Sequence, residues 1–254
     1  MSVAAQGAGR PGDWERDGWL LIAQYLSEDE RALLCAEADR LWAQPELFAL
    51  RGAVPNSPTR NDRLEPVIDL CEPFRDLAYD APLLALASEL LGGKAQLMKD
   101  KFIVKPGGAG GYDTHQDAAY WQGLGIAPGD FLTAVVFLDD STRDKGPIEC
   151  VPGHHATLLT APGAIADVEE GLLDAPFEAV EARAGDLLLL HSLTPHRSGP
   201  NRSAETRRAL LFTYAVDSRP GLYDRYREFR GSTTAARRWV FAPAAGVIER
   251  PQLC

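Results

Sequence analysis

The sequence has few cysteines, no long apolar run and fewer basic than acidic residues, and each shortage excludes a class of protein. The four cysteines form no C-x-x-C pair, which argues against a disulfide framework or zinc knuckle and favours reduced thiols in a cytoplasmic protein: Cys35, Cys71, Cys150 and Cys254. No apolar run approaches the roughly 20 residues of a membrane span. Lys and Arg number 26 against 36 Asp and Glu, a net charge of −10, so nucleic acid is not expected as a partner. Without an apolar run of that length, no membrane partner is expected either.

The length and composition suit one globular domain. Hydrophobic residues make up 45% of the 254 residues and charged residues 24%, which is enough to bury a full core. Residues 1–12 lack a basic region followed by an apolar core, so we expect a short disordered tail and no secretory signal. Residues 13–94 are expected to be mostly helical, 95–218 to form a β-rich core, and 219–254 to form a C-terminal lid or extension.

Local patterns place the main elements. Ser27 and Glu30 form a capping box that predicts a helix over 28–44. Pro82 predicts the start of another helix, which stops at Gly92-Gly93. Further on, short apolar runs separated by Gly/Pro turns predict strands, listed here with one near the N-terminus: Trp19–Ile22, Gln96–Val104, Phe131–Leu138, Ile148–Val151, Asp186–His191 and Arg208–Val216. This is a mainly β chain with flanking helices, a sandwich or barrel.

A metal site is indicated by His115 and Asp117, which follow a glycine-rich turn. Two residues apart on a strand, they can point to the same side, because side chains alternate with period two. One imidazole and one carboxylate leave several coordination positions of a divalent metal free. A second histidine would complete the 2-His-1-carboxylate triad that holds non-haem Fe(II) in oxygenases. By themselves, the two residues could also form a solvated turn.

Four other histidines are candidates for the third ligand, and we prefer His196. His191 ends a fully apolar run, so a core histidine is the simpler interpretation. His154 and His155 follow the Pro152-Gly153 turn and are expected to be loop or entrance residues. We expect one strand to deliver His191 and then His196 near its far end.

The residues after His196 indicate a second, acidic ligand. Arg207 and Arg208 open an apolar strand expected to lie next to the one that carries His196. A buried guanidinium beside iron could bind the distal carboxylate of a 2-oxo acid that chelates the metal, and Ser198 could donate a further hydrogen bond. The alternative is that both arginines lie at a solvated strand start, which must hold for one of them.

Three lysines share parity on the strand before the metal motif. Lys99, Lys101 and Lys105 therefore either line an active-site cleft or face solvent, and parity alone favours neither. Charges that face a core are costly unless they are paired with anions. Tyr120 and Trp121 could form a substrate wall or an ordinary core pair.

Taken together, these segments resemble the phytanoyl-CoA dioxygenase family of Fe(II)- and 2-oxoglutarate-dependent oxygenases. The similarity is in the opening 15–19, the turn and metal motif 105–107 and 115–121, the turn 146–155, and the block from 185 to 208. In the turn, His154 stands where the family usually has serine.

The resemblance implies a double-stranded β-helix (jelly-roll, cupin-like) core and assigns roles to residues. His115, Asp117 and His196 would bind iron. Arg207 would bind the distal carboxylate of 2-oxoglutarate with help from Ser198, and Lys99 or Lys101, with Lys99 as our choice, would add a further contact. With O2 as the oxidant, the reaction would give succinate and CO2.

The expected activity is hydroxylation or a related oxidation of a small-molecule substrate. Similar halogenases need a free coordination site where Asp117 stands, so the carboxylate argues against halogenation. Composition suggests a GC-rich bacterial source, in which a natural-product tailoring role is plausible. The alternatives are a cupin-type metal enzyme that ignores 2-oxoglutarate and a non-catalytic jelly-roll binding module. The sequence leaves the substrate and the oligomeric state open.

Overall fold

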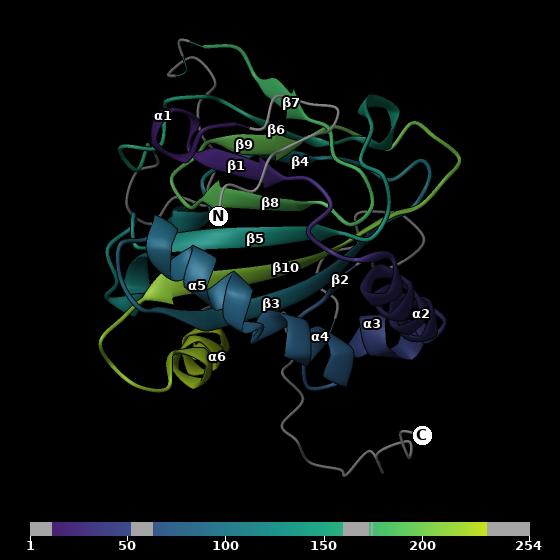
Figure 1. The fold of residues 1–254 in the computed structure, drawn as a ribbon, viewed down its shortest axis with the longest axis horizontal. Helices are drawn as coiled ribbons and strands as arrows, with labels where there is room; N and C mark the ends of the chain where they lie inside the picture. The colour runs from purple at the N-terminus through teal and green to yellow at the C-terminus, as the bar shows by residue number, and fades with distance from the viewer. Residues whose placement is uncertain (1–11, 52–62, 160–172, 174, 233–254) are drawn as a thin grey trace.

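Two antiparallel sheets form the centre of the protein (Figure 1). The computed structural model describes residues 12–51, 63–159, 173 and 175–232. The larger sheet has the strand order β1-β8-β5-β10-β3-β2, and the smaller sheet has the order β4-β9-β6-β7. The predicted jelly-roll class is confirmed, as two sheets and not as a closed barrel.

Six of the ten described strands (β1, β3, β5, β6, β8 and β10) agree with predicted apolar runs, and β2, β4, β7 and β9 were not among those runs. In the larger sheet they are β1 (Trp19–Ile22), β2 (Arg63–Leu64), β3 (Ala95–Lys105), β5 (Phe131–Phe137), β8 (Leu187–His191) and β10 (Arg207–Val216). In the smaller sheet they are β4 (Tyr112–His115), β6 (Ile148–Cys150), β7 (Glu178–Val180) and β9 (His196–Ser198). The two-residue strand β2 was not expected from the sequence, because nothing marks so short a segment except its pairing with β3.

Helices cover the outer face of the larger sheet (Figure 1). They are α2 (Glu28–Trp42), α3 (Pro45–Arg51), α4 (Glu72–Ala78) and α5 (Ala81–Leu90), while α6 (Leu222–Ser232) lies beside β3 and the short helix α1 (Trp14–Asp17) lies at the edge of the sheet next to β1. The predicted capping box starts α2: the Ser27 hydroxyl accepts from the Glu30 amide, and the Glu30 carboxylate accepts from the Ser27 amide. No helix among the described residues is long and apolar enough to cross a membrane.

The central strands are apolar on both faces because each face packs against a different layer. On β5, Leu132, Ala134 and Val136 join the core under the helices, while Val135 and Phe137 join the core between the sheets. Alternate side chains of a strand point to opposite faces, so a strand covered on both sides becomes a continuous apolar run.

Two expected strand arrangements were wrong. The strand of His191 does not continue to His196: β8 ends at His191, and His196 starts β9 in the other sheet. The strand of Arg207 is not beside that of His196 either, because β10 pairs with β5 and β3. Arg207 and His196 therefore belong to facing sheets, a relation that chain order does not reveal.

The C-terminal segment contributes a packed helix as far as it is described. Leu222 and Tyr226 of α6 are buried against Met98 and Trp121, and the Tyr223 hydroxyl donates to buried Asp100 at 2.6 Å. Residues 1–11 and 233–254, in which most of the expected tail and extension fall, lie outside the described residues.

Candidate active site

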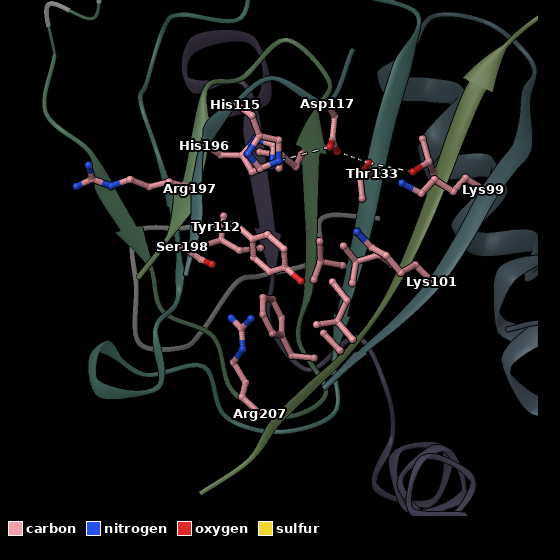
Figure 2. Close-up of a pocket in the computed structure, with 18 residues that line it drawn as sticks. Lys99, Lys101, Tyr112, His115, Asp117, Thr133, His196, Arg197, Ser198 and Arg207 are labelled. Atoms are coloured by element: carbon pink, nitrogen blue, oxygen red, sulfur yellow. Dashed lines mark hydrogen bonds and ion pairs between the residues drawn. The ribbon is translucent and has the colours of Figure 1, made fainter. Parts of the chain in front are cut away.

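The three predicted metal ligands lie together between the two sheets (Figure 2). His115, the last residue of β4, pairs in register with His196, the first residue of β9, and their ring centroids are 4.2 Å apart. One ligand atom from each histidine and one from Asp117 all lie within 4.8 Å of one another. The structure thus brings His115 and Asp117 of the motif together with His196, the histidine preferred as their partner.

Backbone carbonyls fix the orientation of both histidine rings. Nδ1 of His115 lies 2.7 Å from the carbonyl oxygen of Asp113, and Nδ1 of His196 lies 2.9 Å from that of Thr194. A carbonyl can only accept, so each Nδ1 carries a proton, and Nε2 is the ring nitrogen of each histidine that can bind a metal. Such contacts hold a ligating imidazole in the right tautomer, so the donor set fits a divalent metal.

The carboxylate of the triad is also held in place. The Thr133 hydroxyl on β5 donates to Asp117 at 3.0 Å. Burial lowers the pKa of His115 to about 3. Burial alone would raise the pKa of Asp117, but the nearby histidines and lysines outweigh it and lower this pKa to about 2. Near neutral pH, His115 is neutral and Asp117 is ionised, as metal binding requires.

Asp117 is not on the same strand as His115, which corrects the expected geometry. β4 ends at His115, Gln116 is extended, and Asp117 opens the 3₁₀ helix η1 (Asp117–Leu124). The buried Gln116 side chain holds this turn, because its amide donates to the carbonyl of Leu193 and accepts from the amide of Leu159.

The other histidines are not in the triad. Nδ1 of His154 faces the carbonyl of Pro152. His155 and His191 lie ring to ring at 5.3 Å, and Trp14 packs edge-on against His191 at 5.4 Å. Burial lowers the pKa of His191 to about 4, so the interpretation of His191 as a core histidine agrees with its packing.

At the other end of the pocket lies Arg207 (Figure 2). It is only 5% exposed, its Nη1 donates to the Ser141 hydroxyl at 3.2 Å, and its Nε has no hydrogen-bond partner. Within the described residues no carboxylate forms an ion pair with Arg207, and burial lowers its pKa to about 10. A buried cation without a counterion is costly, so this position suits an anionic ligand.

Two hydroxyl groups lie between Arg207 and the three predicted metal ligands. Ser198 lines the pocket and accepts from Lys105 Nζ at 3.2 Å, which leaves its own proton for a ligand. Tyr112 pairs with Ser198 across β4 and β9, and its hydroxyl points toward the Arg207 end of the pocket (Figure 2).

The lysine parity was consistent with a cleft, and the structure places Lys99 and Lys101 in the same pocket. Lys99 Nζ lies 3.8 Å from the Glu65 carboxylate and 5.7 Å from the centroid of the Trp121 ring. Lys105 does not line this pocket: it is fully buried and donates to the Gly146 carbonyl.

Sequence reasoning missed three residues that shape the pocket. Thr133 is the one polar residue in the apolar strand β5, a signal that could have marked it. Tyr112 lies three residues before His115, where parity gives no indication of its direction. Glu65 follows a segment with no regular pattern, so only the fold places it beside Lys99.

Comparisons with known proteins agree with this geometry. The model of the phytanoyl-CoA dioxygenase family matches residues 14–209, more than half of the chain. The chain is 27% identical to a methylphosphonate hydroxylase of Gimesia maris, covering 84% of this chain and 82% of that protein. It is 30% identical to an L-proline trans-4-hydroxylase of Streptomyces griseoviridis, covering 84% and 88%.

Solved structures are similar over the same length. EctD from S. alaskensis with bound Fe has a TM-score of 0.70 and 25% identity, with 84% of this chain and 81% of that chain covered. The epimerase SnoN in complex with Fe3+, alpha ketoglutarate and nogalamycin RO has a TM-score of 0.67 and 26% identity, with 80% of each chain covered. The alternatives without 2-oxoglutarate are thereby set aside. The chain belongs to the phytanoyl-CoA dioxygenase family and is a non-haem Fe(II)- and 2-oxoglutarate-dependent oxygenase.

Proposed function

We propose that His115, Asp117 and His196 hold the Fe(II) of this oxygenase and that Arg207 and Ser198 hold its 2-oxoglutarate. The observation that carries the proposal is one pocket containing both a facial set of two imidazoles and a carboxylate and, at its other end, a buried guanidinium without an ion-pair partner among the described residues. When bound, Fe(II) and 2-oxoglutarate supply the oxidising chemistry with O2, and succinate and CO2 are the co-products.

The residues of the chain bind and orient these groups. His115 and His196 would offer Nε2, because their Nδ1 atoms face backbone carbonyls. Asp117 would offer the carboxylate oxygen that faces His115, at 3.8 Å from its Nε2, while its other oxygen accepts from Thr133. This division keeps the carboxylate ionised and limits its rotation.

The distal carboxylate of 2-oxoglutarate would lie against Arg207. A guanidinium can donate two parallel hydrogen bonds to a carboxylate, and the Arg207 Nε is buried with no acceptor of its own. The Ser198 and Tyr112 hydroxyls border the same space. Lys99 stays a prediction as a further contact of the co-substrate, because its ion pair with Glu65 already gives it a counterion.

The apolar part of the pocket would exclude water around the reacting groups. Its wall between the charged ends is formed by side chains from β3, β5, β6, β8 and β10: Ile103, Val135, Phe137, Ile148, Leu190, Ala209 and Leu211. A dry wall strengthens the charged contacts at both ends, since the effective dielectric constant falls.

Anaerobic addition of Fe(II) and then 2-oxoglutarate to the full chain tests the proposal. We expect a weak visible charge-transfer band that saturates with 2-oxoglutarate. A folded protein that binds Fe(II) but gives no band would contradict the assignment of the co-substrate site.

The substrate is proposed at the level of class. The chain's relatives include hydroxylases named for methylphosphonate and L-proline and a structure determined with a nogalamycin derivative. These names support a small polar metabolite as the substrate and a natural-product tailoring role for the enzyme, and a cytoplasmic location remains an expectation. Succinate release across a panel of metabolites would test this, and any active compound must be turned over with one succinate formed per product.

A further inference from the structure

The pocket contains more positive charge than its proposed ligands neutralise. When all five groups are ionised, Lys99, Lys101 and Arg207 bring three positive charges, and Glu65 and Asp117 bring two negative ones. A divalent metal adds two positive charges, and the two carboxylates of 2-oxoglutarate remove two. One positive charge is therefore left when both are bound.

The other basic residues near the pocket do not bring an unpaired negative charge that would neutralise this surplus. The Arg197 guanidinium lines the pocket but pairs with Glu149 at 2.7 Å, so the two charges cancel. Lys105 is buried beside Ser198, and Arg63 lies 5.8 Å from the centroid of the Tyr112 ring. Neither of these two residues supplies a negative charge.

The surplus is located at Lys101. No described residue accepts a hydrogen bond from its amine or forms an ion pair with it, whereas Lys99 has Glu65 and Arg207 has Ser141. Burial, with the like charges of Lys99 and Arg63, keeps the pKa of Lys101 well below its usual value. An anion at this position would reverse that effect, because an opposite charge favours the charged amine.

Lys101 is at a different end of the pocket from Arg207. Across β10 and β3, Arg207 pairs with Lys105 and Leu211 pairs with Lys101, so four residues, or roughly 13 Å of strand, separate the two positions. Figure 2 shows the Lys101 amine on the side of Lys99 and the metal ligands, away from the Arg207 guanidinium. A 2-oxoglutarate bound to Arg207 and the metal leaves Lys101 to another ligand.

Residues around Lys99 and Lys101 hold the positively charged end of the pocket in place. Glu65 accepts from the Tyr226 hydroxyl at 3.0 Å and lies 3.8 Å from Lys99, so helix α6 and the segment that follows β2 fix the Lys99 side chain. Lys99 is thereby kept beside Lys101 and adds to the positive potential there without needing a ligand of its own.

We propose that the substrate of this oxygenase is a small anion whose carboxylate or phospho group binds Lys101, with its oxidised carbon turned toward the triad His115, Asp117 and His196. This inference rests on the proposed function. It adds the chemical class of the substrate and names Lys101 as the residue that binds its charged group.

The test uses the full chain loaded with Ni(II), a redox-inert substitute for Fe(II), and saturated with 2-oxoglutarate. The probes are propionate, propylphosphonate and the uncharged propionamide, titrated by calorimetry. We expect at least one anion to bind about tenfold or more tightly than propionamide, since a charge-assisted hydrogen bond is worth about that factor. The stronger of the two anions identifies the acid group.

Variants assign the effect to its residue. Lys101→Met should abolish the preference for the anion and leave the affinity for 2-oxoglutarate unchanged within about threefold. Lys101→Gln serves as a second variant if the first does not fold. The matched control, Lys94→Met, removes an exposed lysine just before β3 and should change neither affinity.

The outcomes separate this inference from the proposed function. If 2-oxoglutarate does not bind to the Ni(II)-loaded wild-type protein, the proposed function fails first. If it binds but neither anion does, or propionamide binds equally well, the anionic substrate class is refuted. If Lys101→Met weakens 2-oxoglutarate binding as much as anion binding, Lys101 serves the co-substrate and the inference is wrong.

Discussion

Arg207 and Arg208 are neighbours on β10, but their guanidinium groups lie on opposite faces of the larger sheet. Arg207 points into the pocket and has only the Ser141 hydroxyl as a hydrogen-bond partner among the described residues. Arg208 points outward, where its guanidinium binds both oxygens of Asp139 at 2.8 Å and also contacts Asp39 of α2. Arg207 is available to a ligand, whereas Arg208 connects helix α2 to the larger sheet through its ion pairs.

This difference predicts that alanine substitutions of the two arginines affect different properties, ligand affinity for Arg207 and stability for Arg208. Arg207→Ala should weaken 2-oxoglutarate binding by about 10- to 100-fold, since hydrogen bonds to charged groups are worth about 1.5–3 kcal/mol. Arg208→Ala should leave that affinity nearly unchanged and lower the free energy of unfolding by about 1 kcal/mol, because its ion pairs are only partly buried. Titration of the charge-transfer band and urea unfolding measure the two effects. Equal losses of 2-oxoglutarate affinity would refute the assignment of Arg207.

Tyr112 should contribute to the same carboxylate site, but less than Arg207. Its hydroxyl points toward the Arg207 end of the pocket (Figure 2), where it can donate to the distal carboxylate. Tyr112→Phe keeps the ring and removes the hydroxyl, so we expect the dissociation constant of 2-oxoglutarate to rise by about tenfold, or about 1.4 kcal/mol. The Fe(II) affinity measured before 2-oxoglutarate is added should stay the same. A loss of Fe(II) binding would mean that Tyr112 shapes the metal site instead.

The metal assignment predicts a contrast between two histidines. His196→Ala removes a ligand and should lower Fe(II) affinity by more than about 100-fold, since even residues that only support a ligand are worth 10- to 100-fold. His154→Ala changes a turn residue that faces the Pro152 carbonyl and should leave Fe(II) affinity unchanged. Anaerobic competition with a colorimetric chelator measures both constants. Strong iron binding by the His196 variant would exclude it from the triad.

Local chemistry made the proximity of the proposed metal ligands His115 and Asp117 predictable, and tertiary pairing decided the rest of the site. His115 and Asp117 are two residues apart, so the chain itself keeps them close. His196 was chosen as the third ligand because two arginines follow it in the sequence. The error lay in the path between His191 and His196. The segment Ser192–Pro195 looks like a strand continuation in sequence, but it crosses from one sheet to the other, and no local pattern marks that crossing.

The role of Lys99 and Lys101 could not be decided from parity for a similar reason. Alternation shows that the two side chains share a face of β3, but not whether that face is covered. Glu65, next to β2, and Tyr226 of α6 form the contacts that place Lys99 inside. Both come from segments distant in sequence, so their effect on β3 appears only in the fold.

His191 predicts a pH dependence of stability that is separate from the metal site. Its half-buried ring packs against Trp14 and His155, and the loss of solvent around it lowers its pKa to about 4, compared with about 6.5 in an unfolded chain. Between these values the unfolded chain binds a proton that the folded protein does not. The stabilisation is therefore complete above pH 6.5 and is lost as the pH falls toward 4.

Substitution of His191 should flatten this dependence. In His191→Asn the side-chain oxygen can still accept from the Leu193 amide, as Nδ1 of His191 does at 3.2 Å, but the titrating group is gone. For the metal-free protein, we expect the free energy of unfolding to fall between pH 7 and 4.5 by about 2 kcal/mol less in the variant than in the wild type. Urea unfolding at several pH values measures this difference. His115 titrates in both proteins, so its contribution cancels, and between pH 7 and 8 the two curves should run parallel. If the curves are also parallel below pH 6, His191 is protonated in the folded protein and its burial does not control its pKa.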